Sequence, residues 1–343
     1  MDDLRETNRP GDVTIKDVAA RAGVSIATVS RALDERKPSQ GPKSDLVRAI
    51  AIELGYRRHL SAANLRRGST HTIGVLVPRL TDTVMALLYE QIAAACTRID
   101  RFAVVATTGD DTVTQRRAVE ELLGRRVDGL IIASARTDDD HIAELRQRRV
   151  PHVLALRTDG DSLAVVGDDR LGGYLAARHL IDLGHEDIGL IAGPIYASSV
   201  RWRIEGFHQA LDEAGLTPRP EMESVGSFSM EAGEDACRRM MTSGSRRPTA
   251  LFVMNDNAAV GAMSALTRLG LSIPDDISVV GYNDIPLASR LPVPLTTLRV
   301  PFADVANAAL DLLIHDPGRD GARLLVKAPT LIPRQSSGRP PRS

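Results

Sequence analysis

The side chains that could perform covalent or acid–base chemistry are scattered along this chain of 343 residues. Its 8 histidines are dispersed, and its 2 cysteines, Cys96 and Cys237, lie far apart in the sequence. This spacing excludes a disulfide scaffold and a thiolate zinc site, and it fits a reducing cytoplasm. No Gly-x-Gly-x-x-Gly, P-loop, nucleophile-elbow or His-Glu-x-x-His motif is present. The sequence therefore gives no support to an enzyme, a metal site or a bound cofactor.

Polar side chains of another kind gather near the N-terminus. Ser25, Thr28, Ser30 and Arg31 follow one another closely. The Arg31 guanidinium is suited to a forked contact with guanine, and the hydroxyl groups both donate and accept hydrogen bonds. Such side chains can contact a nucleic acid together only if one short element presents them.

The sequence around this group predicts two short helices joined by a tight turn. Thr14 is expected to cap the first helix, with Asp17 as its reciprocal partner three residues later. Gly23 ends that helix, since Gly readily takes the left-handed conformation of a helix terminus. Ser25 then caps a second helix over Ile26–Leu33.

Two helices in this arrangement form a helix-turn-helix, and an amphipathic stretch over Ser44–Leu54, ended by Gly55, completes a three-helix core. In this motif the first residues of the second helix enter the major groove of DNA. These residues are Ser25, Ile26, Ala27, Thr28, Ser30 and Arg31. A generic helical hairpin is the alternative interpretation.

The distribution of charge agrees with a nucleic-acid-binding head. The whole chain has 43 Lys and Arg against 44 Asp and Glu, a net charge of −1. Between Val13 and Thr70, however, 11 basic residues stand against 5 acidic ones. A basic segment followed by a mildly acidic one favours a polyanion-binding head, although an unevenly charged, solvated surface would have the same composition.

The remainder of the chain alternates between apolar runs and amphipathic segments, which predicts βαβ units and parallel sheets. Strands are expected near 73–77, 102–106, 130–133 and 153–156, and after Gly167 near 189–192, 250–253 and 277–280. Helices are expected near 84–99, 113–123, 139–148, 171–183, 204–214, 232–241 and 258–269. This pattern predicts two doubly wound lobes with a small-molecule site between them, at the carboxyl ends of the strands. No apolar run reaches the roughly 18 residues of a membrane span, and no signal peptide is expected.

The ordered motifs resemble those of the LacI/GalR family of transcriptional regulators. In the head they are Thr14-Ile15-Lys16-Asp17-Val18-Ala19, Ala22-Gly23-Val24-Ser25, Thr28-Val29-Ser30-Arg31-Ala32-Leu33 and Leu54-Gly55-Tyr56. Later motifs include Val127-Asp128-Gly129, His179-Leu180 with Gly184-His185, Asn255-Asp256, and Pro274-Asp275-Asp276 with Gly281-Tyr282. The resemblance implies an N-terminal all-α helix-turn-helix head and an α/β, two-lobed, type I periplasmic-binding-protein-like body.

The resemblance also implies which residues contact DNA. Ile26, Ala27 and Arg31 match the family's base-reading positions. The family positions that contact phosphates or flank the base-reading residues correspond to Thr14, Ile15, Ser25, Thr28 and Ser30. In the hinge, Ala62 and Leu65 match contact positions, and Leu65 is expected to wedge into the minor groove. His59 could add a phosphate contact when protonated or instead cap the hinge helix. The chain departs from the family in having Arg58 and His59 where Pro and Asn are usual, and a packed linker residue is the alternative role for Leu65.

The family's pocket positions correspond to Asp82, Val84, Met85, Arg157, Asp168, Arg203, Phe228, Asn255, Asp256 and Asn283. Their carboxylates, amides and guanidinium groups suit a polyol or nucleoside. Two departures bear on the ligand: Asn283 stands where the family usually has Asp, and the loop at Asp82 lacks the usual aromatic residues. Asp168 and Asp256 could instead be loop or capping residues at strand ends.

Together these observations predict a helix-turn-helix domain over 12–57, a hinge over 58–70, an effector-binding and dimerisation domain over 71–335, and a disordered tail over 336–343. The protein is expected to be a cytoplasmic, sequence-specific repressor that binds a pseudo-palindromic double-stranded DNA operator as a homodimer or a tetramer. It is expected to respond to a sugar, nucleoside or related metabolite. A repressor controlled by a protein partner is an alternative. A solute-binding protein or an enzyme on the same body fold is less compatible with the head.

Overall fold

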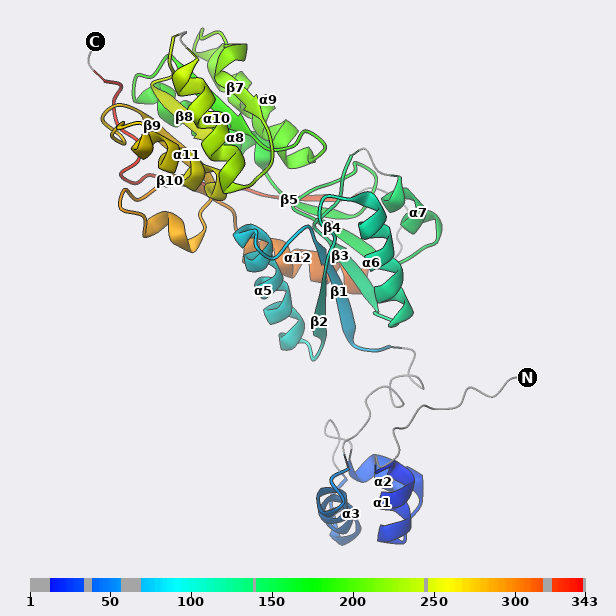
Figure 1. The fold of residues 1–343 in the computed structure, drawn as a ribbon. Helices are drawn as coiled ribbons and strands as arrows, with labels where there is room; N and C mark the ends of the chain where they lie inside the picture. The colour runs from blue at the N-terminus through cyan, green and yellow to red at the C-terminus, as the bar shows by residue number, and fades with distance from the viewer. Residues whose placement is uncertain are drawn as a thin grey trace. The chain divides into compact units, whose positions relative to one another are not determined.

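The computed structural model describes residues 13–33, 39–56, 69–137, 140–243, 246–316 and 323–341. Contacts within the chain divide it into two units, the head (Met1–Thr70) and the body (His71–Ser343), which are drawn in Figure 1. None of the helices within the described ranges is long and apolar enough to cross a membrane.

The described residues of the head form three helices around a small apolar core. They are α1 (Ile15–Ala22), α2 (Ile26–Ala32) and α3 (Pro42–Glu53). Each contributes one completely buried valine, and these are Val18, Val29 and Val47. The third helix begins two residues earlier than expected, because Pro42 occupies its first turn, where a missing N–H costs nothing.

The helix ends in the head have the predicted caps. Thr14 and Asp17 form the reciprocal capping box, in which Asp17 Oδ2 accepts from the Thr14 backbone N–H at 2.7 Å. Gly23 ends α1 with a φ of 63°. Ser25 Oγ then accepts from the Thr28 N–H at 3.2 Å and starts α2. These local bonds fix the turn, so α2 presents its first residues at the surface.

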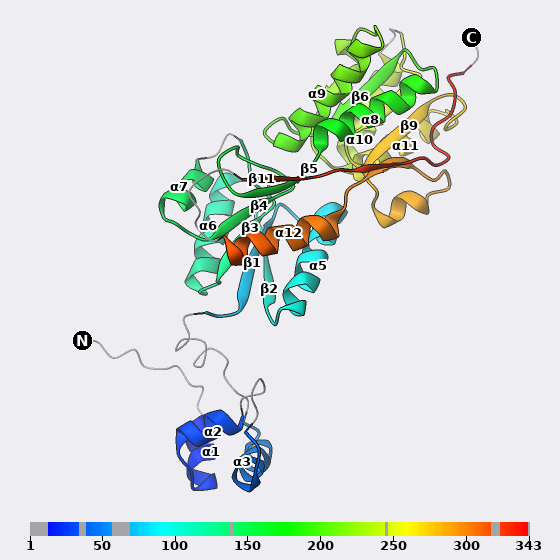
Figure 2. The same ribbon diagram turned by 180° about the vertical axis from the view of Figure 1, so that it is seen from behind.

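The first sheet of the body, with its helices, forms the N lobe. Its strand order is β11-β5-β4-β3-β1-β2, and all of its pairings are parallel. The strands are β1 (Thr72–Val77), β2 (Phe102–Thr107), β3 (Gly129–Ile132), β4 (His152–Ala155), β5 (Ala164–Gly167) and β11 (Leu324–Lys327). The helices are α5 (Thr83–Arg98), α6 (Thr112–Gly124), α7 (His141–Gln147) and α12 (Phe302–His315). Helices α5 and α12 share one hydrophobic cluster, and α6 and α7 share another on the opposite face (Figure 2).

The second sheet forms the C lobe, with strand order β12-β10-β9-β8-β6-β7 and an antiparallel edge strand, β12. The strands are β6 (Ile188–Ala192), β7 (Glu223–Val225), β8 (Ala250–Val253), β9 (Ser278–Asn283), β10 (Thr296–Arg299) and β12 (Thr330–Ile332). The helices are α8 (Asp169–Asp182), α9 (Ser198–Glu213), α10 (Met230–Thr242) and α11 (Asp256–Arg268). Clusters of buried side chains place α8 and α9 on one face and α10 and α11 on the other. The short helices η1 (Pro220–Met222) and η2 (Pro286–Ser289) lie in loops.

The chain crosses between the two lobes at three points. It passes from β5 to α8, returns from β10 to α12, and crosses again from β11 to β12. Strand β5 and helix α12 were not among the expected elements, yet α12 contributes Val305, Ala309 and Leu313 to the core. Each lobe is therefore built from segments distant in sequence.

The C-terminal segment corrects one prediction. Residues 336–341 were expected to belong to a disordered tail, but they lie along the C lobe, and Ser336 is completely buried. Ser336 Oγ donates to the Val279 carbonyl at 2.6 Å and accepts from the Thr296 N–H at 2.8 Å. The ring of His185 lies within hydrogen-bond distance of the Gly338 carbonyl at 3.0 Å. Tertiary hydrogen bonds thus fix a segment whose composition suggests disorder.

Candidate functional site

The exposed start of α2 is the candidate nucleic-acid interface. Ser25, Ile26, Ala27 and Arg31 are exposed, and Thr28 is half-buried. Ile26 keeps 40% of its surface accessible although it is a large apolar side chain. An apolar residue in this position can contact a thymine methyl, and Arg31 can reach a guanine.

The other residues of the head that were predicted to contact DNA are less exposed or have structural roles. Ser30 is half-buried on α2. Thr14 uses its hydroxyl to donate to Asp17 Oδ2 at 2.7 Å, so its primary local role is capping. Ile15 packs against the head's apolar cluster. The hinge residues His59, Ala62 and Leu65 lie outside the described residues, and their roles stay predictions.

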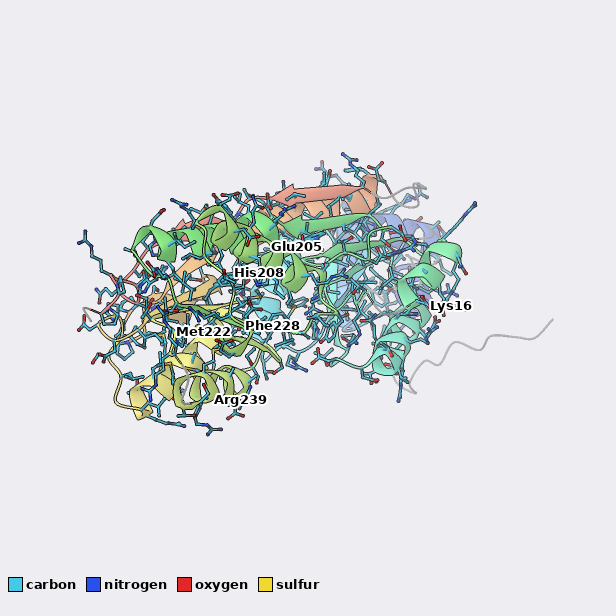
Figure 3. The ribbon with its side chains drawn as sticks, turned by 90° about the horizontal axis from the view of Figure 1, so that it is seen from above. Lys16, Glu205, His208, Met222, Phe228 and Arg239 are labelled. Carbon is cyan, nitrogen blue, oxygen red and sulfur yellow. The ribbon has the colours of Figure 1, made fainter. Side chains whose placement is uncertain are left out.

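The second site is a pocket between the two lobes of the body, with about 470 Å³ of empty space including its open mouth. Loops after β1, β4 and β5 of the N lobe face loops after β7, β8, β9 and β10 of the C lobe. The lining residues are Asp82, Val84, Met85, Leu156, Arg157, Gly167, Asp169, Ser199, Arg203, Phe228, Asn255, Asn283 and Val300. Phe228 is labelled in Figure 3, where the labelled Glu205, His208 and Arg239 lie elsewhere on the C lobe and do not line the pocket.

Two predicted pocket residues do not line this pocket. Asp168 caps α8, where its Oδ1 accepts from the Leu171 N–H at 3.0 Å. Asp256 is completely buried and accepts from Thr297 Oγ1 at 2.6 Å and from the Ile285 N–H at 2.8 Å. Burial raises the pKa of Asp256 to about 7, and its two hydrogen bonds oppose the shift. Both aspartates therefore hold the scaffold around the pocket.

The remaining predicted residues line the pocket, and the structure adds others. Asp169 lines the pocket in place of its neighbour Asp168. The Asp169 side chain faces the pocket, whereas the Asp168 side chain caps α8. Ser199 joins from the first turn of α9. The sequence pointed to Asp168 in this loop but could not tell which aspartate caps the helix, since Asp168 and Asp169 both stand at the start of α8. Leu156, Gly167 and Val300 have no polar side chain, so the sequence did not indicate that they line the pocket.

Arg203 has a counter-ion and hydrogen-bond partners beside it. Its Nε donates to Asp169 Oδ1 at 2.8 Å, and its Nη1 donates to the Met254 carbonyl. The Tyr282 hydroxyl donates to the same Asp169 oxygen at 3.2 Å, and the Arg203 guanidinium lies 3.6 Å from the Tyr282 ring centroid. Burial raises the pKa of Asp169, and the neighbouring Arg203 charge opposes that rise. Arg203 and Asp169 thus form a buried, paired wall of the pocket.

Arg157 differs from Arg203 in the same pocket. Only 4% of its surface is accessible. Its guanidinium carbon lies 5.9 Å from the Tyr196 ring centroid and 5.8 Å from that of Phe228. Among the described residues, no acceptor lies within hydrogen-bond distance of this guanidinium. The Asn283 amide likewise has no hydrogen-bond partner among the described residues, so both side chains have unused hydrogen-bonding capacity.

Several hydrogen bonds join the lobes near the pocket. The Tyr196 hydroxyl of the C lobe donates to Asp110 Oδ1 of the N lobe at 2.9 Å. The Thr137 N–H donates to the Tyr196 carbonyl at 3.0 Å, and Arg136 lies 3.6 Å from the Tyr196 ring centroid. Asn257 Nδ2 donates to Asp82 Oδ1 at 3.1 Å. The side chains around the pocket therefore also hold the two lobes together.

The described residues show no group of three His, Cys, Asp or Glu side chains that could hold a metal ion. The chemistry available to the pocket is hydrogen bonding and charge, with an apolar face from Phe228. Such a lining binds a polar small molecule and orients it.

Comparison with known proteins connects both sites to regulators of transcription. Residues 14–59 match the family described as bacterial regulatory proteins, lacI family, and residues 177–337 match a periplasmic binding protein-like domain. The chain is 37% identical over 306 residues to the ribose operon repressor of Escherichia coli K12, an alignment that covers 88% of this chain and 92% of that protein. It is 32% identical over 330 residues to the HTH-type transcriptional repressor PurR of Haemophilus influenzae, covering 94% and 98% of the two chains.

Solved structures are similar over the same regions. The lac repressor dimer bound to operator and the anti-inducer ONPF gives a TM-score of 0.84 at 31% identity, covering 95% of this chain and 99% of that one. A LacI family transcriptional regulator from Enterococcus faecium with bound ribose gives a TM-score of 0.68 at 30% identity, covering 78% and 98%.

Proposed function

Because the chain belongs to the lacI family of bacterial regulatory proteins, we propose that it is a transcriptional repressor whose affinity for an operator changes when a small polar effector binds between its lobes. The effector is a sugar, nucleoside or related metabolite. The observation that carries this proposal is the inter-lobe pocket, in which Arg157 and Asn283 have hydrogen-bonding groups that no described residue satisfies. These groups line the pocket, so a polar ligand that enters it can form hydrogen bonds with them.

The DNA-binding half of the proposal rests on α2. Its capped N-terminus presents Ile26 and Ala27 at the surface, with Arg31 one turn further along. In a homodimer, two such helices enter successive major grooves of a pseudo-palindromic operator. The related lac repressor was solved as a dimer on its operator, which supports the same assembly for this chain. We place the protein in the cytoplasm, where that DNA lies.

The effector half rests on the contacts between the lobes. A ligand that touches Asp82 and Arg157 of one lobe and Arg203 and Asn283 of the other favours one relative position of the lobes over another. That preference is transmitted to the DNA-binding form of the dimer. Couplings of this kind are typically about 1–3 kcal/mol, which changes operator affinity roughly 5- to 150-fold. The related regulator with bound ribose supports an effector of sugar size.

The alternatives have less support. A solute-binding protein would use the same body but has no need of the capped helix-turn-helix. The relatives named above are repressors and not enzymes. Nothing in the described structure favours control by a protein partner over control by a ligand in the pocket.

Selection of DNA sites from a random library by the full chain tests the proposal. We expect a pseudo-palindromic site, and we expect Arg31→Met to relax base preference at one position in each half-site. Arg117→Met, an exposed arginine of α6 in the body, is the matched control. Enrichment of no consensus sequence, or identical preferences for Arg31→Met and the parent, would contradict the proposal.

A further inference from the structure

We propose that the effector of this pocket carries an oxyanion, a phosphate or carboxylate group on a sugar-sized polyol, and that Arg157 binds this group. The inference rests on the proposed function and specifies the class of its ligand.

The first observation is the contrast between the two pocket arginines. Arg203 and Arg157 have similar burial, with 7% and 4% of their surfaces accessible. Arg203 is neutralised by Asp169 and donates to a carbonyl as well. Arg157 lies nearly 6 Å from the centroids of the Tyr196 and Phe228 rings, and it forms no ion pair with any residue in the described ranges. Ring faces attract a cation but do not replace the several hydrogen bonds that a guanidinium can donate.

The second observation is that the nearby carboxylates are engaged elsewhere. Asp110 pairs with Arg79 and accepts from the Tyr196 hydroxyl. Asp82 Oδ1 accepts from the Val84 N–H and from Asn257 Nδ2, both at 3.1 Å. Both carboxylates act on Arg157 through space, but neither forms an ion pair with it. The Arg157 charge therefore lacks a direct counter-ion in the described structure.

The third observation is the backbone that delivers Arg157 to the pocket. Strand β4 ends at Ala155, and Leu156 then adopts a φ of 63°, a left-handed conformation that is unfavourable for a leucine. This turn directs the chain into the pocket lining, of which Leu156 and Arg157 are both part. Asn283 on the opposite lobe also has a positive φ of 108°. Unfavourable backbone at two pocket residues is typical of a binding site, where positioning outweighs local stability.

These observations favour an oxyanion over a neutral hydroxyl. A buried, unpaired cation is costly, and a ligand oxygen with negative charge offsets that cost far better than a neutral one. The planar guanidinium also matches phosphate and carboxylate oxygens in a forked geometry. Phosphate and carboxylate share this chemistry, and separate ligands distinguish them.

Calorimetric titration of the full chain tests the proposal with ribose, ribose 5-phosphate, ribonate and inorganic phosphate. We expect at least one of the two anionic sugars to bind roughly 10- to 150-fold more tightly than ribose, the gain expected from hydrogen bonds to a charged group. Arg157→Met should abolish that advantage, and Arg157→Lys should retain part of it. Arg117→Met, which changes an exposed arginine in the same way, should leave the preference intact.

Thermal unfolding of the same proteins provides a second measurement. Without ligand, Arg157→Met should melt roughly 2–4 °C above the parent, because it removes an unpaired buried charge. Inorganic phosphate at constant ionic strength should stabilise the parent but not Arg157→Met.

The outcomes separate the two proposals. Tight binding of neutral ribose, with no gain from an anionic group, would overturn the oxyanion assignment and leave the proposed repressor function intact. Equal stabilisation of the parent and Arg157→Met by phosphate, or no stabilisation of either, would also overturn the assignment. A failure to bind any operator would contradict the proposed function whatever the ligand results.

Discussion

The Tyr196 hydroxyl in the C lobe donates a hydrogen bond of 2.9 Å to Asp110 Oδ1 in the N lobe. Asp110 is held by Arg79 of its own lobe, and the Tyr196 ring is covered by Arg136. Burial raises the pKa of Tyr196, as does its bond to Asp110, so the phenol stays protonated and remains a donor. This bond favours the observed relative position of the lobes.

Tyr196→Phe should weaken effector binding, because it removes one bond between the lobes and keeps the ring. A loss of about 1 kcal/mol corresponds to a roughly fivefold weaker affinity. Titration with ribose and ribose 5-phosphate measures the effect. Tyr174→Phe is a matched control, since it removes a 2.8 Å bond to the Glu213 carboxylate within one lobe. Equal effects of the two substitutions would show that the bond between lobes has no special role.

Asp256 should make stability depend on pH. Its pKa is about 7 in the folded protein and near 4 in the unfolded chain. Between these values the folded state holds a proton that the unfolded state has lost, so the contribution of Asp256 to stability falls as the pH rises from about 4 to about 7.

Asp256→Asn should remove this dependence, because an amide does not titrate in this range. The difference in unfolding free energy between pH 5 and pH 8 should be smaller in the variant than in the parent by roughly 2–4 kcal/mol. Denaturant titration at the two pH values measures it. Asp275→Asn, at an exposed position, serves as control. Parallel pH profiles for parent and Asp256→Asn would contradict the assignment.

Ser336→Ala should destabilise the body. It leaves the Val279 carbonyl and the Thr296 N–H without their side-chain partner. Each such buried group costs about 1–3 kcal/mol, and we expect a total of roughly 2–4 kcal/mol in denaturant unfolding. Ser227→Ala, at an exposed loop position, should change stability by less than about 0.5 kcal/mol. A Ser336→Ala variant as stable as the parent would argue against a fixed C-terminal segment.

Leu65→Ala should weaken specific operator binding by about tenfold or more, if this leucine inserts between base pairs as the family resemblance implies. Affinity for random DNA should be nearly unchanged, because phosphate contacts supply it. Gel-shift titration with both DNAs measures the ratio. Leu269→Ala, an exposed leucine at the end of α11, is the control. An equal loss on both DNAs would rule out a wedge.

The sequence predicted best what is determined locally. The capping box of Thr14 and Asp17 and the turn at Gly23 involve residues close in the chain, so their chemistry is visible in the sequence. Seven strands of the body appeared as apolar runs because the middle of each parallel sheet is buried on both faces. Strand bounds shifted by one to three residues, since hydrogen bonds and not hydrophobicity define where pairing ends.

What the sequence missed depends on distant partners. The Ser-Ser-Gly segment at 336–338 looks disordered, and its order comes from bonds to Val279, Thr296 and His185. Asp168 and Asp256 have the polar character expected at strand ends near a ligand, but one caps a helix and the other is enclosed by Thr297 and Ile285. Only the three-dimensional arrangement distinguishes a residue that faces the pocket from one that supports it.

The three crossings between the lobes also determine when the protein can fold during synthesis. The N lobe needs α12 and β11, which leave the ribosome only after β6–β10 of the C lobe have been made. The C lobe in turn needs β12 and Ser336, close to the end of the chain. A messenger RNA cut short before these codons therefore yields no finished lobe, only a helix-turn-helix joined to unfolded chain that cellular proteases can degrade.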